Sequence, residues 1–278
     1  MKKSAGVLLA TAVLALSSAC AGSGPDSSAG VSGDGEQAGA SAAADQSPSD
    51  APLTRDNFVE RLSSAQLDAG SAHIETTTSG SGMDVSMTGD IVIAKRLEDS
   101  ASRISMDTAG MPMELRLVGG NLYLKMEQLT GGKFLEVDLD DPEDAFAKNF
   151  GNLTEQLDPA EQLDLFDKAL ADFENQGDGG TIDGVETTKL RLVLDTRAVL
   201  DGRAGAQKLG SKIPEKMEYV LYVGEDDLMR RMTADVAGTA TTTDWSRWGE
   251  EVEVEAPKKS EIADIPPFAF PTAGSGAA

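Results

Sequence analysis

The stretch that decides the fold is Met113–Met126, which reads MELRLVGGNLYLKM. On each side of the central Gly119-Gly120 pair, apolar residues alternate with polar ones. Such alternation is typical of a half-buried β-strand, because successive side chains of a strand point to opposite faces. Two glycines between two alternating runs are typical of a tight hairpin turn. The stretch therefore predicts a β-hairpin with strands 113–118 and 121–126.

Further strand patterns lie on both sides of this hairpin. They are predicted at 73–78, 85–95 (with a break at Gly89-Asp90), 134–139, 187–194, 217–223, 228–236 and 239–245. The strands follow one another without the spacing of parallel β-α-β units. We therefore expect a large antiparallel sheet.

Helix signals interrupt the strands at four places, each with a capping residue or an apolar stripe. They are a helix after Thr54 with Phe58, Leu62, Ala65 and Ala69 on one face, a helix from Asp141-Pro142, a helix from Asp158-Pro159 with Leu163, Phe166, Leu170 and Phe173 on one face, and a helix over 196–209. The predicted fold class is α+β, with a curved antiparallel sheet that carries helices on one face.

Charge and composition exclude several classes of function. The chain has 278 residues with 24 Lys and Arg against 47 Asp and Glu, a net charge of −23, which argues against a nucleic-acid partner. One Cys and one His exclude a disulfide within the chain and a zinc site built from these residue types. The sequence lacks a G-x-S-x-G motif and a phosphate-binding glycine loop. We expect no enzyme activity, no cofactor and no metal ion.

Three conspicuous features are interpreted as structural. His73 lies in a strand-like run without a motif partner. The acidic cluster over 138–144 is a helix cap rather than a calcium loop, because Pro142 stands at the fifth place and no glycine follows. Trp245 and Trp248 are expected to anchor the end of the sheet, with contact to a ligand or a membrane as the alternative.

The amino terminus has the pattern of an export signal. A basic start, Met1-Lys2-Lys3, precedes the apolar run Val7–Leu16, which is too short to span a bilayer. Small residues up to Ala19 lead to Cys20, and this order resembles a bacterial lipobox, although Ser17 stands where the motif usually has Leu. We predict a lipoprotein signal peptide over 1–19, cleavage between Ala19 and Cys20, and lipid attachment at Cys20. The alternative is an ordinary secretory signal with an incidental cysteine.

Composition divides the rest of the chain. Residues 20–52 hold the lipidated Cys20 and a Gly/Ser/Ala-rich tether, which cannot bury enough apolar surface to fold. Residues 53–265 are predicted to be a single domain, and 266–278 a disordered tail. The alternative for the tail is an extended segment that packs on the domain through Phe268 and Phe270.

Several of these motifs occur together in one known family. They are the lipobox, the helix before His73, Val118–Lys125, Thr181–Leu190 (TIDGVETTKL), Glu218–Val223, Leu228–Met232 and Asp244–Pro257 (DWSRWGEEVEVEAP). In this order they resemble the LppX/LprAFG-type envelope lipoproteins of actinobacteria. The resemblance implies a half-barrel, a strongly bent antiparallel sheet whose concave face is covered by helices, with an apolar cavity for acyl chains between them. Related carrier folds are of the LolA/LolB kind.

The resemblance directs attention to apolar side chains that would face such a cavity. The candidates are Met113, Met126, Phe146, Phe150, Leu163, Phe166, Leu170, Met217, Leu221 and Met232. Methionine is flexible and polarisable, so it suits a wall that accepts variable chains. The alternative is that the methionines are ordinary core residues.

The sequence leaves three hypotheses for function. The first is a monomeric, lipid-anchored protein on the extracytoplasmic face of the cell membrane that binds lipid or glycolipid acyl chains, as a carrier or chaperone in envelope lipid transport with a transporter as partner. The second is a non-carrier binding or sensory module with a protein partner, which predicts a packed interior and an exposed apolar patch. The third is an enzyme acting on envelope polymers, which needs carboxylates around a cleft.

Overall fold

The computed structural model describes residues 51–80, 83–108, 110–138, 168–200, 214–236 and 238–263. The helices are α1 (Phe58–Ala69), α2 (Glu127–Thr130) and α6 (Thr196–Leu200), with short 3₁₀ turns at Leu97–Asp99 and Lys259–Glu261. The strands are β1 (Ser71–Gly80), β2 (Met83–Val92), β3 (Ala101–Thr108), β4 (Met111–Val118), β5 (Asn121–Met126), β6 (Phe134–Asp138), β7 (Leu170–Ile182), β8 (Val185–Asp195), β9 (Lys216–Gly224), β10 (Met229–Val236) and β11 (Thr239–Ser246).

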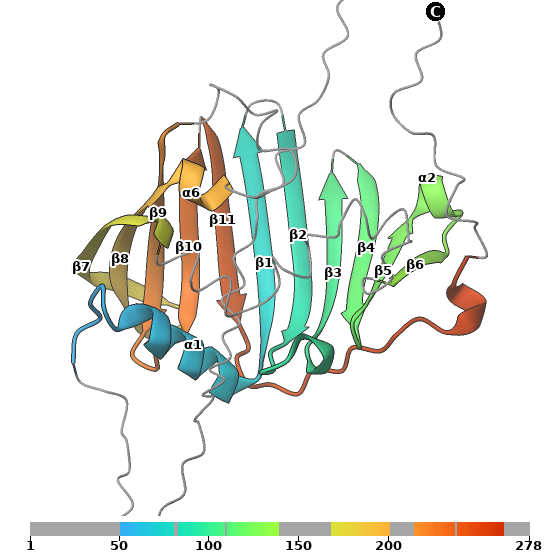
Figure 1. Cartoon of the computed structure of the whole chain (residues 1–278), viewed down its shortest axis with the longest axis horizontal. Coiled ribbons are helices and arrows are strands. Elements are labelled where there is room, and N and C mark those ends of the chain that lie inside the picture. The colour runs from blue at the N-terminus through green and yellow to red at the C-terminus, as the bar shows by residue number, and fades with distance from the viewer. Residues whose placement is uncertain are drawn as a thin grey trace, which may run out of the picture.

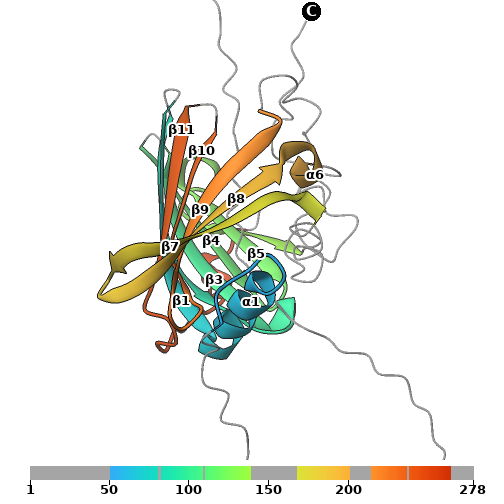
Figure 2. The same ribbon diagram turned by 90° about the vertical axis from the view of Figure 1, so that its left-hand side faces the viewer.

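The described strands form one open antiparallel sheet. Its 11 strands have the order β6-β5-β4-β3-β2-β1-β11-β10-β9-β8-β7, so every neighbour is consecutive in the chain except the pair β1 and β11 (Figure 1). That pair joins an amino-terminal meander to a carboxyl-terminal one. Seen from the side, the strands at the β7 end are steeply inclined to β1 and β11, so the sheet is twisted and curved (Figure 2).

Helix α1 packs on one face of the sheet, which we call the inner face. Its side chains Phe58 and Leu62 are fully buried, as the helical spacing predicts. The ring of Phe58 lies 4.9 Å from that of Phe173 on β7. Arg61 makes a bidentate ion pair, at 2.6 and 2.9 Å, with Asp227 in the turn between β9 and β10. These contacts fix α1 in front of the half of the sheet from β7 to β1 (Figure 1).

The hydrophobic core lies between α1, α6 and the inner face. Alternate residues of the paired strands share this face, and they bury Ile74 with Trp245, and Leu192 and Leu194 of β8 with Val199 of α6. The indole of Trp248 donates a hydrogen bond to the carbonyl oxygen of Met229 at 2.9 Å. The prediction that Trp245 and Trp248 anchor the end of the sheet is confirmed.

The predicted hairpin and the antiparallel sheet are confirmed, while several boundaries were wrong. Leu170 and Phe173 belong to strand β7 and not to a helix, because Leu170 pairs with Leu194 of β8. Strand β3 was not predicted at all. The predicted helix over 196–209 is present as α6 at Thr196–Leu200, and its remainder lies outside the described residues, as do 139–167 with the helix start at Asp141. The inner face is thus seen to carry α1 and α6.

In the described part of the chain, no helix is both long and apolar enough to cross a membrane.

The predicted break at Gly89-Asp90 is absent, because β2 runs through both residues. Gly89 lies opposite Ile74 and Ile104 in the register. A Cβ atom there would lie 2.5 Å from the carbonyl oxygen of Arg103 and 3.0 Å from the Cα atom of Ile104. Main-chain atoms of a paired strand have little room to yield, so the close approach of β2 to β3 requires glycine.

We expect Gly89→Ala to lower the free energy of unfolding by roughly 1–3 kcal/mol, because the added methyl group must push β2 and β3 apart. Urea denaturation measures this change. The control is Ser105→Ala, at an exposed position of β3, which should stay within about 0.5 kcal/mol of the unmodified protein. Equal stability of the two variants would show that the strands part without cost.

Candidate functional site

Four methionines lie side by side across the inner face. In the register of the sheet, Met87 of β2 is opposite Met106 of β3, Met106 is opposite Met113 of β4, and Met113 is opposite Met126 of β5. Directly opposite residues of antiparallel strands project to the same face. We call Met87, Met106, Met113 and Met126 the methionine row. With strands about 4.8 Å apart, the row is about 14 Å long.

The same line continues into the half of the sheet under α1. Met87 is opposite Thr76, Thr76 opposite Thr243, Thr243 opposite Met232, and Met232 opposite Leu221. The hydroxyl groups of Thr76 and Thr243 lie 3.0 Å apart and satisfy each other, so this pair adds no free polar group to the line. The line is therefore apolar from β9 to β5.

Burial divides the predicted cavity residues into two groups. Leu170, Met217, Leu221 and Met232 are buried in the core cluster that includes Phe58 and Leu62 of α1, and here ordinary core packing accounts for them. Met113 and Met126 are half-buried and lie at the far end of the methionine row. Phe146, Phe150, Leu163 and Phe166, like Ala19 and Cys20, lie outside the described residues.

Sequence reasoning missed two members of the row. Met106 was missed because strand β3 was not predicted, and Met87 because the break assumed at Gly89-Asp90 disturbed the alternation of β2. Met106 could be found by sliding 101–108 against the hairpin strand from Met113, in the register that brings Met106 opposite Met113 and Ile104 opposite Leu115.

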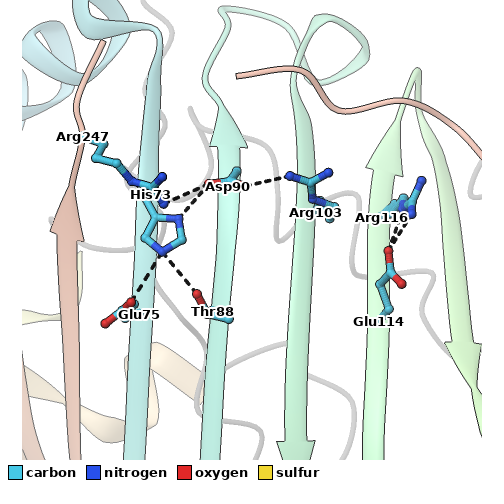
Figure 3. A network of polar contacts seen from close by, with 8 residues as sticks. All are labelled: His73, Glu75, Thr88, Asp90, Arg103, Glu114, Arg116 and Arg247. Carbon is cyan, nitrogen blue, oxygen red and sulfur yellow. Dashed lines mark hydrogen bonds and ion pairs between the residues drawn. The ribbon is translucent and has the colours of Figure 1, made fainter. Parts of the chain in front are cut away.

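A polar network occupies the opposite, outer face at the base of β1, β2 and β3 (Figure 3). Nδ1 of His73 lies 2.7 Å from Oδ1 of Asp90, and Nη2 of Arg103 donates to Oδ2 of Asp90 at 2.9 Å. On its other side, Nε2 of His73 lies 3.2 Å from the hydroxyl of Thr88. An imidazole that carries its proton on Nδ1 donates to Asp90 and accepts from Thr88, so the neutral ring satisfies both contacts.

The network holds the Asp90 carboxylate in its charged form. The hydrogen bond from His73 is the largest cause that lowers the pKa of Asp90, partial burial opposes it, and Arg103 lowers the pKa further. Arg247 adds a longer ion pair to Oδ1 of Asp90 at 3.6 Å. Each of these side chains therefore has a polar partner within the group, which is the pattern of a structural clamp.

Residues 247–263, here called the C-terminal strap, run along the base of the sheet from β1 to β6 (Figure 1). The hydroxyl of Ser71 donates to the carbonyl of Glu250 at 2.6 Å, and Nη1 of Arg116 donates to that of Glu255 at 3.1 Å. At the far end, the amide of Ala263 donates to the carbonyl of Phe134 on the edge strand β6 at 2.7 Å. The strap thereby connects the end of β11 with the edge strand β6.

The outer face also has an open groove of about 610 Å³ over β1 to β5. Its side chains belong to the two rows that flank the methionine row and are Glu75, Thr77, Ser86, Thr88, Ser105, Asp107, Pro112, Glu114, Lys125 and Glu127. Four residues whose side chains point to the inner face also border the groove, namely Thr76, Met87, Met106 and Met113. They contribute main-chain atoms to its wall. Its charged side chains are four carboxylates and one lysine, so the groove carries a net negative charge. Within the described residues, no three His, Cys, Asp or Glu side chains gather as a metal ion would require.

Comparison with known proteins gives structural matches only. No family model matches the chain, and a search of curated proteins finds no match. Among solved structures, the lipoprotein LppX of Mycobacterium tuberculosis is 19% identical, over 70% of this chain and 96% of that chain, with a TM-score of 0.46. LprF of Mycobacterium bovis is 17% identical, over 73% and 96%, with a TM-score of 0.49. A LolA superfamily protein of Nitrosomonas europaea is 10% identical, over 73% and 96%, with a TM-score of 0.28. Two of the structures found, LppX and LprF, have names of the type that the sequence resembles.

The pKa of Asp90 leads to a prediction about acid stability. A carboxylate whose pKa is lowered on folding stabilises the protein above its unfolded-state pKa, near 3.8, and loses this contribution as the pH falls through the folded-state pKa. We expect Asp90→Asn to lower the free energy of unfolding by about 1 kcal/mol at pH 7 and by less at about pH 3. Denaturation curves at both pH values measure the difference. Asp84→Asn, at an exposed position of the same strand, should change neither value, and an Asp90→Asn deficit that is equal at both pH values would contradict the prediction.

Proposed function

We propose that this chain is an exported, membrane-anchored lipoprotein that binds acyl chains of lipids or glycolipids along the methionine row, as a carrier or chaperone in envelope lipid transport. The observation that carries the proposal is the continuous line of apolar side chains and one threonine pair across the inner face. It ends in four methionines on four adjacent strands, of which Met87 is buried and Met106, Met113 and Met126 are half-buried. Unbranched, polarisable side chains can adapt their rotamers to a ligand whose length and saturation vary.

The energetics set the requirement that such a protein must meet. Taking an acyl chain of about sixteen carbons out of a membrane costs on the order of 12 kcal/mol, at about 0.8 kcal/mol per CH₂ group. A carrier offsets this cost only by offering the chain an apolar surface of similar length. The line from Thr76 to Met126 crosses four strand-to-strand steps, which corresponds to about 19 Å. That length is of the same order as an extended acyl chain.

The anchor belongs to the same proposal. A lipidated Cys20 with two or more acyl chains would hold the protein stably at the outer face of the membrane. A flexible tether of about 30 residues has a root-mean-square span of roughly 30 Å. The domain would then work close to its source of lipid without being pressed against the bilayer.

A second candidate function uses the outer groove. Its volume of about 610 Å³ lies in the range of small-ligand sites, and its hydroxyl and carboxylate lining would suit a polar ligand or a partner protein. This is the non-carrier binding or sensory module. The exposed apolar patch expected of such a module has little support in the described residues, where Met111, 47% exposed, is the only exposed large hydrophobic side chain.

A pair of neighbouring substitutions separates the two functions. Met106→Glu places a charge on the inner face, and Ser105→Glu places the same charge in the outer groove. We expect Met106→Glu to weaken the binding of a fluorescent palmitate analogue at least about tenfold, because the carboxylate would have to be buried or protonated. Ser105→Glu should leave the affinity unchanged.

Two controls accompany this pair. Circular dichroism and a denaturation curve show whether Met106→Glu still folds, and Met113→Gln offers a milder polar change of similar shape in the same row. If Ser105→Glu abolishes binding and the row variants do not, the ligand occupies the outer groove and the proposal fails.

Lipid anchoring is tested by Cys20→Ser in a bacterial host with lipoprotein processing. We expect the unmodified protein in the membrane fraction and the variant in the soluble exported fraction, because the thiol is the attachment point for the acyl groups. Cys20 is the only cysteine, so metabolic labelling with a palmitate probe should report this single site. A variant that remains in the membrane fraction would overturn the lipobox assignment.

A further inference from the structure

One buried polar group in α1 has no hydrogen-bond partner among the described residues. Gln66 is 2% exposed, and its Nε2 atom makes no hydrogen bond to any described residue. Among the described residues, Oγ1 of Thr196 is the other buried side-chain atom that has no hydrogen-bond partner. Leaving a buried amide donor unsatisfied is unfavourable, and such groups in folded proteins call for an explanation.

The position of Gln66 connects it with the methionine row. Gln66 follows Phe58 and Leu62 at spacings of four on the buried side of α1, so it faces the sheet. It lies in the last turns of the helix, where its carbonyl accepts from the amide of Gly70 at 3.0 Å. The carbonyl of Gly70 in turn accepts from the amide of Ile93, the residue after β2. The end of α1 that carries Gln66 therefore adjoins the base of β1 and β2, where the packed half of the inner face meets the methionine half (Figure 1). Thr76 and Met87 lie five residues further along these strands, at a distance of about 17 Å.

The chemistry of this group restricts its ligand. Nε2 of a glutamine is a donor only, so its partner must be an acceptor oxygen. The charged residues of α1 are Glu60, Arg61 and Asp68, and the one cation among them, Arg61, is held by Asp227 at 2.6 Å. An anionic carboxylate or phosphate beside Gln66 would lie among apolar side chains without a cation from this helix, which is costly. A neutral carbonyl oxygen meets the requirement.

We infer that Gln66 donates a hydrogen bond to an ester carbonyl of the bound lipid, so that the site selects acyl esters over hydrocarbon chains that lack a carbonyl. This inference rests on the proposed function, since it names the group of the ligand that lies at the base of β1 and β2. The acyl chain then extends from Gln66 along β2 toward Met87 and Met106, and the ester oxygen accepts from a donor of α1 that has no partner among the described residues.

The test compares two lipids that differ in the carbonyl groups alone. One is a phosphatidylcholine with two palmitoyl esters, and the other is the diether with two hexadecyl chains. Each is offered to the full-length processed protein from the same detergent micelles, and the bound lipid is measured by native mass spectrometry. We expect the diester to bind roughly 5–10-fold more tightly, which corresponds to one hydrogen bond.

Variants of α1 assign this preference to one side chain. Gln66→Leu should bind both lipids with equal affinity, and without lipid it should melt at the same or a higher temperature than the unmodified protein, because an unpaired donor is replaced by an apolar group of similar size. Ser63→Ala, at another buried polar position of the same helix, should keep the preference for the diester. Equal binding of both lipids by the unmodified protein overturns the role of Gln66 and leaves the proposed function standing. A preference that survives in Gln66→Leu also overturns it, and a failure of both lipids to bind overturns the proposed function with it.

Discussion

The pairing of β1 with β11 is the constraint on which the rest of the structure depends. These strands are separated by most of the domain in sequence, and their register places Ile74 opposite Trp245 and Thr76 opposite Thr243. Closing so long a loop is entropically costly, and the pair offsets this cost with a buried tryptophan and a hydroxyl pair at 3.0 Å. Because side chains alternate with a period of two, a slip of one residue here would turn the whole inner row of one meander to the outer face.

This pairing also explains why the inner face has two unequal halves. On the β7 to β1 side, α1 is fixed by the Arg61–Asp227 ion pair and the contact of Phe58 with Phe173, so leucines and methionines are packed as core. On the other side, the same line of the register continues through the buried Met87 of β2 to half-buried methionines on β3, β4 and β5. The row thus begins with side chains that are packed in the core and ends with side chains that are only half-buried. In the proposed function, the half-buried end contacts another apolar group. A sheet with a fully packed inner face would be more stable and would have no room for a ligand.

The sequence was most informative where the pattern was local. The Gly119-Gly120 hairpin, the apolar face of the helix after Thr54 and the alternation of β8 and β9 were predicted because their signals lie within a few residues. The cap expected at Thr54 was wrong, because the N-cap residue of α1 is Asn57 and it makes no side-chain capping hydrogen bond. It failed where a tertiary contact decides. Leu170 and Phe173 have helical spacing, yet pairing with β8 draws them into a strand that three bulges make irregular. The methionine row is a property of register across strands, so a list of methionines in the sequence could name Met113 and Met126 but could not align them with Met87 and Met106.

The two faces of the sheet differ in how they treat polar groups. On the outer face, Asp90 is matched by His73 and Arg103, so burial of its carboxylate is compensated within the protein and the network needs nothing from outside. On the inner face, the hydroxyl groups of Thr76 and Thr243 pair with each other, which keeps the apolar line continuous. Gln66 differs from this pair, since its amide nitrogen is buried and has no hydrogen-bond partner among the described residues. In the proposed function, a donor left open where α1 meets the base of β1 and β2 favours the complex with an acyl ester over the empty protein, because only the complex gives that donor an acceptor.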